Sequence, residues 1–369
     1  MINNVTKIVV KHNNIIVGYL AELSETAIAF QYDSSWLEDG FSISPFSLPL
    51  SNKVFYNSKP VFNGLFGVFH DSMPDGWGEI LLRRFLAKKG FDYDGLSPIV
   101  KLTLIGENGL GGLIYEPSQT TRNPKEEYDL DALAIDIETV LSESGAEIDL
   151  DMLFRLGGSS GGARPKVHLQ IGSEHWIVKF PCVIDKPSIG IEEFTANNLA
   201  SKCGINVNTS RLFPSKIYPS GLFGAKRFDR TSNKRAHVIS LSAILETSHR
   251  IPNLDYIHLF QVIDKISIDK GDSLEAFRRM CFNVFYGNKD DHGKNVSFIY
   301  DTDLKGYRLS PAYDITRTPY KREHEMTVFG KGMPTENDIF AVAKYLKLPL
   351  KACKDIVEKT KQVLTSEDL

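Results

Sequence analysis

A chain of 369 residues is long enough for two or three domains of ordinary size. Hydrophobic residues make up 42% of it and charged residues 24%, which excludes a disordered or low-complexity chain and allows a large buried core. The net charge of -3 lacks the basic excess of nucleic-acid-binding proteins, so we do not expect the chain alone to bind DNA or RNA.

Nothing in the sequence indicates a membrane or an oxidising compartment. No run of about 20 apolar residues occurs, so no membrane-spanning helix is expected. Lys7, Lys11 and His12 interrupt the apolar residues near the N-terminus, which is not the pattern of a secretory signal. The four cysteines are far apart and form neither a metal-binding nor a disulfide pattern. We therefore expect a reduced, cytoplasmic protein.

The first third of the sequence predicts a β-rich part that contains one helix. Strands are expected at residues 7–10, 15–20 and 27–32, where β-branched or alternating residues occur. A helix is expected to start at Pro74 and Asp75 and to stop at Gly90. Residues 102–117, LTLIGENGLGGLIYEP, predict two strands joined by a glycine-rich turn, and the polar residues 117–129 predict a linker.

Beyond this linker the sequence predicts a sheet with one helix and then a mostly helical part. Helices are expected at 130–141 and 192–203, and strands at 167–171, 176–180, 211–213 and 221–228. Helical spacing returns at 256–268, 274–286, 336–346 and 351–364. The prediction is an α+β fold of three parts, with boundaries at 1–120, 121–236 and 237–369.

The segment GGSSGGARPK, residues 157–166, predicts a phosphate-binding loop. Its four glycines let successive backbone N–H groups turn toward one anion. It is not a Walker A loop, because no Gly-Lys followed by Ser or Thr closes it. A flexible linker is the alternative, although a strand is expected directly after the segment.

Lys179 lies in the apolar segment WIVKFP and would need an anionic partner if it were buried. The phosphates of a nucleotide would supply that partner, and a solvent-facing lysine on an edge strand is the alternative. Glu192 and Glu193 open the next helix. Glu192 suits the positive end of the helix dipole, and Glu193 is the candidate for pairing with Lys179.

The segment YGNKDDHGKN places charged and amide groups between two apolar runs. Asp290 and Asn295 have the spacing with which protein kinases place a carboxylate at the acceptor hydroxyl and an amide on a metal ion. Asp314, in LSPAYDITRT, corresponds to a second kinase metal ligand, and this pair suits magnesium. His292 could reach a phosphate or could hold the loop through a backbone hydrogen bond. A solvated turn is the alternative for the segment taken alone.

Together these segments resemble the HipA-type serine/threonine kinases, the toxins of bacterial HipBA-like toxin–antitoxin pairs. The resemblance rests on GLFGVFHDSMPDGWG, SSGGARPK, WIVKFP, EEFTANNLA, AKRFDR, DDHGKN and SPAYDITRT, and runs from residue 63 to residue 318. It implies a bilobed, protein-kinase-like fold. An N-terminal β-rich subdomain (1–120) would precede a nucleotide-binding lobe (121–236) and a mostly helical catalytic lobe (237–369).

The resemblance also implies ATP and magnesium as cofactors and a protein serine or threonine as the acceptor. Asp290 would be the catalytic base, His292 would lie near the phosphates, and Asn295 and Asp314 would bind magnesium. Lys179 would contact the α- and β-phosphates. The other positions implied for ATP are Ser160, Gly161, Gly162, Ala163, Lys166 and Lys294, with the backbone of Lys226 and Phe228 at the adenine.

Regulation and partners are implied by the same resemblance. Ser159 falls where the family has an autophosphorylated serine, and the repeated Ser and Gly leave Ser160 open as the modified residue. The family's best-studied targets are aminoacyl-tRNA synthetases. HVISLSAIL stands where many members have QED after RFDR, so the acceptor of this chain could differ. The expected partner is a small HipB-like DNA-binding antitoxin, through which alone the chain would reach DNA.

Two other functions stay open from the sequence. One is a small-molecule kinase on the same scaffold, with a narrow, acidic acceptor cleft. The other is a nucleotide-binding interaction module that transfers no phosphate. The presence of Asp290, Asn295 and Asp314 favours an active enzyme over the second.

Overall fold

The structure is a computed structural model that describes residues 5–24, 27–120, 128–142, 148–231 and 233–366. The chain divides into two compact units. Unit 1 comprises Met1–Ile191, Ser210–Ile239 and Ala243–Thr247, and unit 2 comprises Glu192–Thr209, Ser240–Ser242 and Ser248–Leu369. The three-part division at residues 120 and 236 remains a prediction, and most of the predicted linker 117–129 lies outside the described residues.

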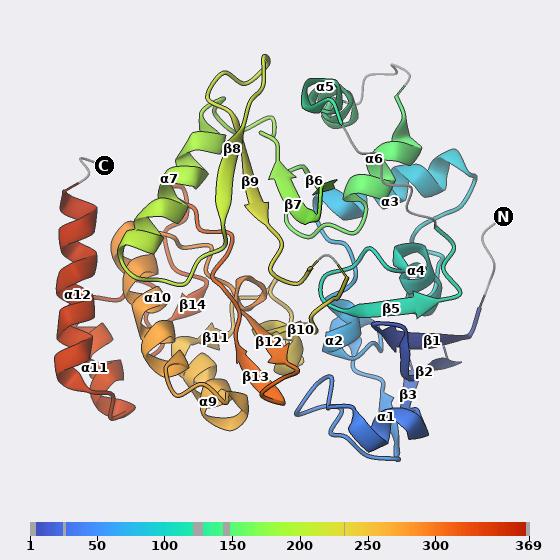
Figure 1. Cartoon of the computed structure of the whole chain (residues 1–369), viewed down its shortest axis with the longest axis horizontal. Coiled ribbons are helices and arrows are strands. Elements are labelled where there is room, and N and C mark those ends of the chain that lie inside the picture. Colours follow the sequence, from blue (N-terminus) through green and yellow to red (C-terminus); the bar gives the residue numbers. More distant parts are fainter. Residues whose placement is uncertain (1–4, 25–26, 121–127, 143–147, 232, 367–369) are drawn as a thin grey trace. The chain divides into compact units, whose positions relative to one another are not determined.

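The first sheet of unit 1 has five strands in the order β4-β3-β2-β1-β5 (Figure 1). The strands are β1 (Lys7–His12), β2 (Ile15–Ser24), β3 (Ala27–Tyr32), β4 (Val54–Asn57) and β5 (Leu113–Glu116). Asn13 and Asn14 join β1 to β2 with φ angles of 47° and 69°, the left-handed turn that matches the twist of a hairpin. The three predicted strands of this region are confirmed.

In the described residues, the same part of the chain contains four helices and one short 3-10 turn. They are α1 (Ser34–Asp39), the turn η1 (Pro60–Phe62), α2 (Gly67–His70), α3 (Trp77–Lys88) and α4 (Pro98–Ile105). The predicted helix before Gly90 is confirmed as α3. The strand predicted from residue 102 is wrong, because those residues belong to α4. Ser97 caps α4 by accepting from the N–H of Val100, and every residue from Ile99 to Ile105 is buried, so no helical pattern is visible in the sequence.

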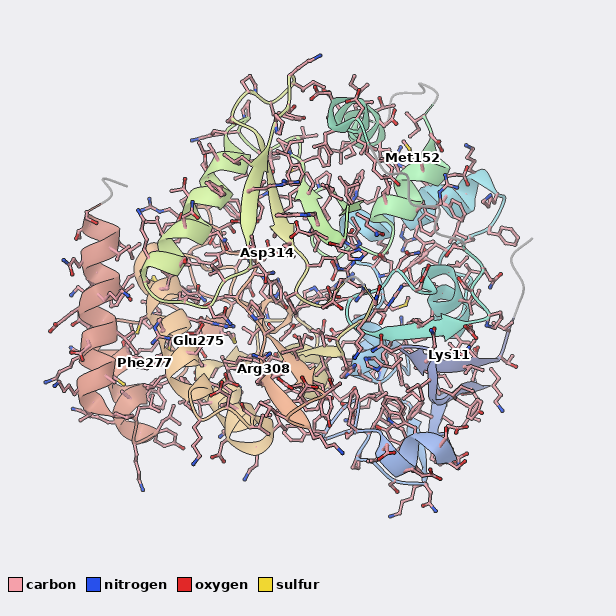
Figure 2. The ribbon with its side chains drawn as sticks, viewed as in Figure 1. Lys11, Met152, Glu275, Phe277, Arg308 and Asp314 are labelled. Atoms are coloured by element: carbon pink, nitrogen blue, oxygen red, sulfur yellow. The ribbon has the colours of Figure 1, made fainter. Side chains whose placement is uncertain are left out.

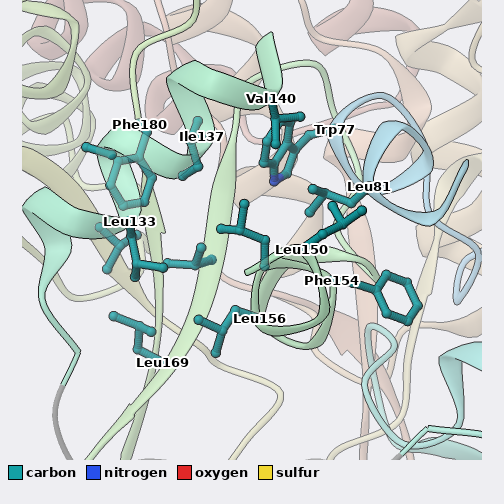
Figure 3. Close-up of a cluster of buried hydrophobic side chains, with 14 of the residues drawn as sticks. Trp77, Leu81, Leu133, Ile137, Val140, Leu150, Phe154, Leu156, Leu169 and Phe180 are labelled. Carbon is teal, nitrogen blue, oxygen red and sulfur yellow. The ribbon is translucent and has the colours of Figure 1, made fainter. Parts of the chain in front are cut away.

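A second sheet of unit 1 has the order β6-β7-β9-β8, and all its neighbouring strands are antiparallel. Its strands are β6 (Lys166–Ile171), β7 (Glu174–Lys179), β8 (Ser210–Phe213) and β9 (Leu222–Lys226). Two helices, α5 (Leu130–Leu141) and α6 (Leu150–Gly157), precede it in the sequence. A buried apolar cluster joins α3, α5 and α6 to this sheet through side chains that include Trp77, Ile137, Phe154 and Leu169 (Figure 3).

Unit 2 is mostly helical, as predicted. Its elements are α7 (Ile189–Lys202), which starts in unit 1, β11 (Leu254–Asp255), α9 (Tyr256–Ile266), α10 (Asp272–Tyr286), the 3-10 turn η2 (Gly293–Asn295), β12 (Ser297–Asp301), β13 (Gly306–Leu309), β14 (Met326–Thr327), α11 (Glu336–Tyr345) and α12 (Leu350–Thr365). The short elements β10 (Val238–Ser240) and α8 (Leu241–Ile244) run from one unit into the other along the chain.

The core of unit 2 holds α10 in place. Ala196 and Leu199 of α7 belong to the same buried cluster as Phe282 and Tyr286 of α10. Gly287 ends α10 in the left-handed conformation, with φ of 82°, which turns the chain into the next loop. None of the helices in the described part of the chain is long and apolar enough to cross a lipid bilayer.

Candidate active site

The loop that follows α10 is anchored by Asp291. This side chain is 2% exposed and accepts a hydrogen bond of 2.8 Å from the hydroxyl of Tyr256. It also contacts the Nδ1 atom of His324 at 2.9 Å and accepts from the backbone N–H of Glu325 at 3.0 Å. No sequence motif had indicated a role for Asp291. Its position between two apolar runs and beside a second aspartate was the available signal.

Asp290, the predicted base, has a different environment. Its side chain is 35% exposed, and its Oδ1 atom accepts from the ammonium group of Lys321. The same ammonium contacts Oε1 of Glu325 at 2.7 Å. Burial lowers the pKa of Lys321, but the hydrogen bonds to Asp290 and Glu325 outweigh burial and raise the pKa overall. Lys321 is therefore a cation placed between two carboxylates, and no sequence pattern predicted it.

Asn295 and Asp314, the predicted metal ligands, line one cavity of unit 2 together with Asp291. The amide nitrogen of Asn295 donates to the carbonyl oxygen of Asp290 at 2.8 Å, so the amide oxygen branches away from that bond. Asp314, labelled in Figure 2, has a φ angle of 57°, a left-handed conformation that non-glycine residues adopt mainly where the structure imposes it. One amide and one carboxylate fit magnesium, which takes few ligands from protein.

His292 and Lys294 shape the turn between these groups. Nδ1 of His292 accepts from the backbone N–H of Lys294 at 3.3 Å, which is the structural role left open by the sequence. The ring of His292 lies 5.2 Å from that of His249, measured between centroids. The carbonyl of Lys294 accepts from the hydroxyl of Tyr313 at 2.8 Å. A role of His292 or Lys294 toward phosphate stays a prediction.

The glycine-rich loop connects α6 to β6 in unit 1 and is fastened to the start of α3. The carboxylate of Asp75 accepts from the N–H of Gly162, and the N–H of Trp77 donates to the carbonyl of Gly162 at 2.9 Å. A Cβ atom on Gly76 would lie 2.4 Å from the oxygen of Gly162, and its φ is 48°, so only glycine permits this approach. The segment MPDGWG therefore holds the glycine-rich loop in place, a role that no sequence pattern had predicted.

The residues of the loop differ in accessibility. Ser159 is half-buried and donates from Oγ to the carbonyl of Asn108 at 2.7 Å, whereas Ser160 is 2% exposed. Gly161 is half-buried, and Gly162 and Ala163 are exposed. Lys166 is a buried residue, and its ammonium group donates to the carbonyl of Gly161 at 2.5 Å.

Lys179 occupies the last position of β7 and lies directly opposite Lys166 of β6. Strand β7 lies between β6 and β9, so the alternative of an edge strand is wrong. Two lysines opposite each other on neighbouring strands repel unless anions lie close to both. The ammonium of Lys179 is also 5.5 Å from the centroid of the Phe223 ring. Glu193 of α7 is buried and Glu192 is exposed.

The segment AKRFDR contains the end of β9, and the residues after the strand form a buried cluster of charged side chains. Asp229 accepts from Arg227 at 2.6 Å, from Arg230 at 2.8 Å and from the N–H of Gly111 at 2.8 Å. Burial raises the pKa of Asp229, but the two guanidinium groups outweigh it and hold the pKa well below its usual range. Lys226 and Phe228 flank this cluster, which therefore fixes the backbone predicted to contact adenine.

The predicted residues form two groups, one in each unit. Unit 1 holds Ser159, Ser160, Gly161, Gly162, Ala163, Lys166, Lys179, Lys226 and Phe228, and unit 2 holds Asp290, His292, Lys294, Asn295 and Asp314. The first group gathers around the loop and the sheet that follows it. The second gathers around the loop after α10.

Comparisons with known proteins show the family to which the chain belongs. The model of the HipA-like C-terminal domain matches residues 158–367, more than half of the chain. The chain belongs to the HipA family. The model of the HipA N-terminal domain matches residues 8–116, which contain the first sheet and α3. The resemblance read from the sequence is confirmed.

Relatives and a solved structure agree with this assignment. Two proteins of Sinorhizobium fredii, "Putative kinase Y4dM" and "Putative kinase Y4mE", are 26% identical over 329 residues and 24% identical over 336 residues. Each alignment covers 82% of this chain and 75% of the relative. HipA of Shewanella oneidensis MR-1, solved with HipB and its operator DNA, matches with a TM-score of 0.72 at 19% identity, over 97% of this chain and 91% of that one. The predicted α+β, HipA kinase-like fold is confirmed.

Proposed function

We propose that this chain is an ATP- and magnesium-dependent protein serine/threonine kinase that acts in the cytoplasm as the toxin of a HipBA-like toxin–antitoxin pair. The proposal rests on the loop of unit 2 that follows α10 and contains Asp290 and Asp291, which we call the catalytic loop. Asp291 is buried and anchors the loop, Asp290 beside it stays accessible, and Asn295 and Asp314 line one cavity. A fixed loop, an accessible carboxylate and two candidate metal ligands suit phosphoryl transfer, because positioning and electrostatics supply most of its catalysis.

The residues would act in the following way. Asp290 would orient the acceptor hydroxyl and accept its proton. Asn295 and Asp314 would hold magnesium, which when bound neutralises charge on the phosphates. Lys166 and Lys179, which lie opposite each other, would contact phosphate oxygens, and the N–H groups of the glycine-rich loop would cover them.

The test is transfer from γ-labelled ATP to the proteins of a cell lysate, with Asp290→Asn as the comparison. Because the amide cannot accept the proton, we expect transfer to fall by about 100-fold or more while nucleotide binding is retained. Label that appears on small metabolites and on no protein would favour a small-molecule kinase. Nucleotide binding without any transfer by the parent protein would favour a non-catalytic module.

Autophosphorylation at Ser159 is part of this proposal. The hydroxyl of Ser159 is half-buried and donates to Asn108, whereas Ser160 is buried, so Ser159 is the better candidate. A phosphoryl group would remove that donor and place a charge of about -2 against the carbonyl oxygen of Asn108, which would drive this part of the loop away from Asn108. Mass spectrometry of protein made with and without Asp290→Asn tests this. Phosphate on Ser159 that requires Asp290 supports it, and an unmodified loop contradicts it.

The partners follow from the same proposal. HipA of Shewanella oneidensis is solved with HipB and operator DNA, and a HipB-like antitoxin is the partner proposed here. The acceptor is proposed to be a protein, with an aminoacyl-tRNA synthetase as the candidate that the family resemblance suggests. Identification of the labelled lysate protein by mass spectrometry tests that candidate.

A further inference from the structure

Lys321 lies outside all the sequence motifs of the site, yet it contacts the proposed base directly. Its ammonium group donates to Oδ1 of Asp290 and lies 2.7 Å from Oε1 of Glu325. The three side chains are partly exposed, with 25%, 35% and 20% of their surface accessible for Lys321, Asp290 and Glu325. They therefore remain close enough to solvent to meet an acceptor.

The backbone around Lys321 is fixed to the catalytic loop. The N–H of Lys289 donates to Oγ1 of Thr318 at 2.8 Å, and the N–H of Thr318 donates to the carbonyl of Gly287 at 3.1 Å. The ammonium group of Lys289 donates to the carbonyl of Lys321 at 2.9 Å. Further along, the N–H of Glu325 donates to the carbonyl of Lys289 at 3.2 Å. Bonds on both sides of Lys321 thus hold it beside Asp290.

Resting on the function proposed above, we infer that Lys321 is a positioning residue for phosphoryl transfer, which orients the carboxylate of Asp290. With Oδ1 bound to the ammonium group, Oδ2 is the oxygen that receives the acceptor hydroxyl. The hydroxyl oxygen forms a bond to the γ-phosphorus while the bond to the bridging oxygen of ADP breaks. ADP leaves with that electron pair, and the hydroxyl proton goes to Asp290. Lys321 stays protonated throughout.

Glu325 completes the arrangement. A lysine side chain has several rotatable bonds and loses their freedom when it is fixed. The carboxylate of Glu325 is a second partner of the ammonium group, at 2.7 Å, so two contacts instead of one limit the positions of the side chain. An acceptor oxygen placed with an error of about 1 Å can cost 100-fold in rate, which is the scale on which this orientation matters.

The experiment measures transfer from γ-labelled ATP and, separately, nucleotide affinity in the full-length protein. Lys321→Met is expected to lower kcat by about 100-fold with unchanged nucleotide affinity. Lys321→Arg keeps a charged donor and is expected to retain most of the rate. For Lys321→Ala, added ethylammonium is expected to restore part of the transfer. Lys361→Met is the matched control, because Lys361 also pairs with a carboxylate of unit 2, Glu336, at 2.6 Å.

Each outcome decides the inference. Transfer by Lys321→Met at the parent rate would overturn it and leave the proposed kinase function intact. Faster transfer would also overturn it, because the ion pair would then restrain Asp290. Loss of transfer that neither Lys321→Arg nor ethylammonium relieves would assign Lys321 a purely structural role. If the parent protein labels neither itself nor any lysate protein, the proposed function fails and the inference fails with it.

Discussion

Asp290 and Asp291 are neighbours in the sequence with opposite environments. The carboxylate of Asp291 is buried and makes hydrogen bonds to Tyr256, His324 and the backbone, whereas that of Asp290 faces one ammonium group and solvent. A buried carboxylate needs partners for its lone pairs, and its removal leaves those partners unsatisfied. Stability and transfer should therefore depend on different members of this pair.

We predict that Asp291→Ala destabilises unit 2 by about 3 kcal/mol or more, because it leaves the buried hydroxyl of Tyr256 and the buried ring of His324 without the carboxylate that they contact. Asp290→Ala is the control and should change the free energy of unfolding by less than about 1 kcal/mol, as expected for an exposed ion pair. Urea denaturation followed by fluorescence measures both. Equal losses in the two variants would contradict the assignment of Asp291 as the anchor.

A second prediction at this scale concerns Asp314. Asparagine tolerates the left-handed conformation that Asp314 adopts, so Asp314→Asn removes charge with little change of backbone. We expect magnesium-dependent ATP affinity to fall by about 10-fold or more, because magnesium prefers a carboxylate ligand. Calorimetric titrations with and without magnesium measure this. Asp264→Asn, at an exposed position of α9, is the control. An unchanged magnesium dependence would exclude Asp314 as a ligand.

At the scale of single elements, β1 carries a buried histidine into the first sheet. His12 packs against Trp36 and Phe41 and lies 6.5 Å from the ring of His237. Burial lowers the pKa of His12 to about 4 and that of His237 to about 3. Both rings are therefore neutral in the folded protein at pH values where they would be protonated in the unfolded chain.

This arrangement predicts acid sensitivity of unit 1. Below pH 6.5 the unfolded chain binds protons that the folded chain does not, so the free energy of unfolding falls between about pH 6.5 and pH 4. Each histidine contributes about 1.4 kcal/mol per pH unit in that window. His12→Gln should destabilise the protein at pH 7.5. At pH 5 the difference in melting temperature between the variant and the parent protein should be smaller, because the parent has lost part of the stability that neutral His12 provides. A gap of the same size at both pH values would contradict this.

Elements with a one-sided apolar pattern could be predicted from sequence, and those without one could not. Helices α3, α9 and α12 have one buried face each, whereas α4 is buried on all sides and its apolar run has the pattern of a strand. The contacts that build the site are also invisible locally. Lys321 is 31 residues from Asp290, and Asp75 is 87 residues from Gly162. The order of the motifs along the chain predicted the family, the glycine-rich loop and the loop after α10. It did not predict the contacts that hold these two loops in place.

At the scale of the whole molecule, charge limits which partners the chain can bind directly. The net charge of -3 offers no general attraction to phosphates. We predict that the purified chain binds duplex DNA weakly and only at low salt, and that a HipB-like antitoxin is required for tight operator binding. Mobility-shift assays at physiological salt, with the chain alone and with a HipB-like antitoxin added, measure this. Tight, sequence-specific binding by the chain alone would contradict the prediction.

The bond between Asp75 and Gly162 has a consequence for how motion of the glycine-rich loop can be observed. A hydrogen-bonded amide exchanges its hydrogen for deuterium only when the bond opens. The deuterium uptake of Gly162 therefore reports how often the loop lifts from α3, before any nucleotide or partner is added. Hydrogen exchange at this one amide therefore measures how often the glycine-rich loop opens in the protein alone.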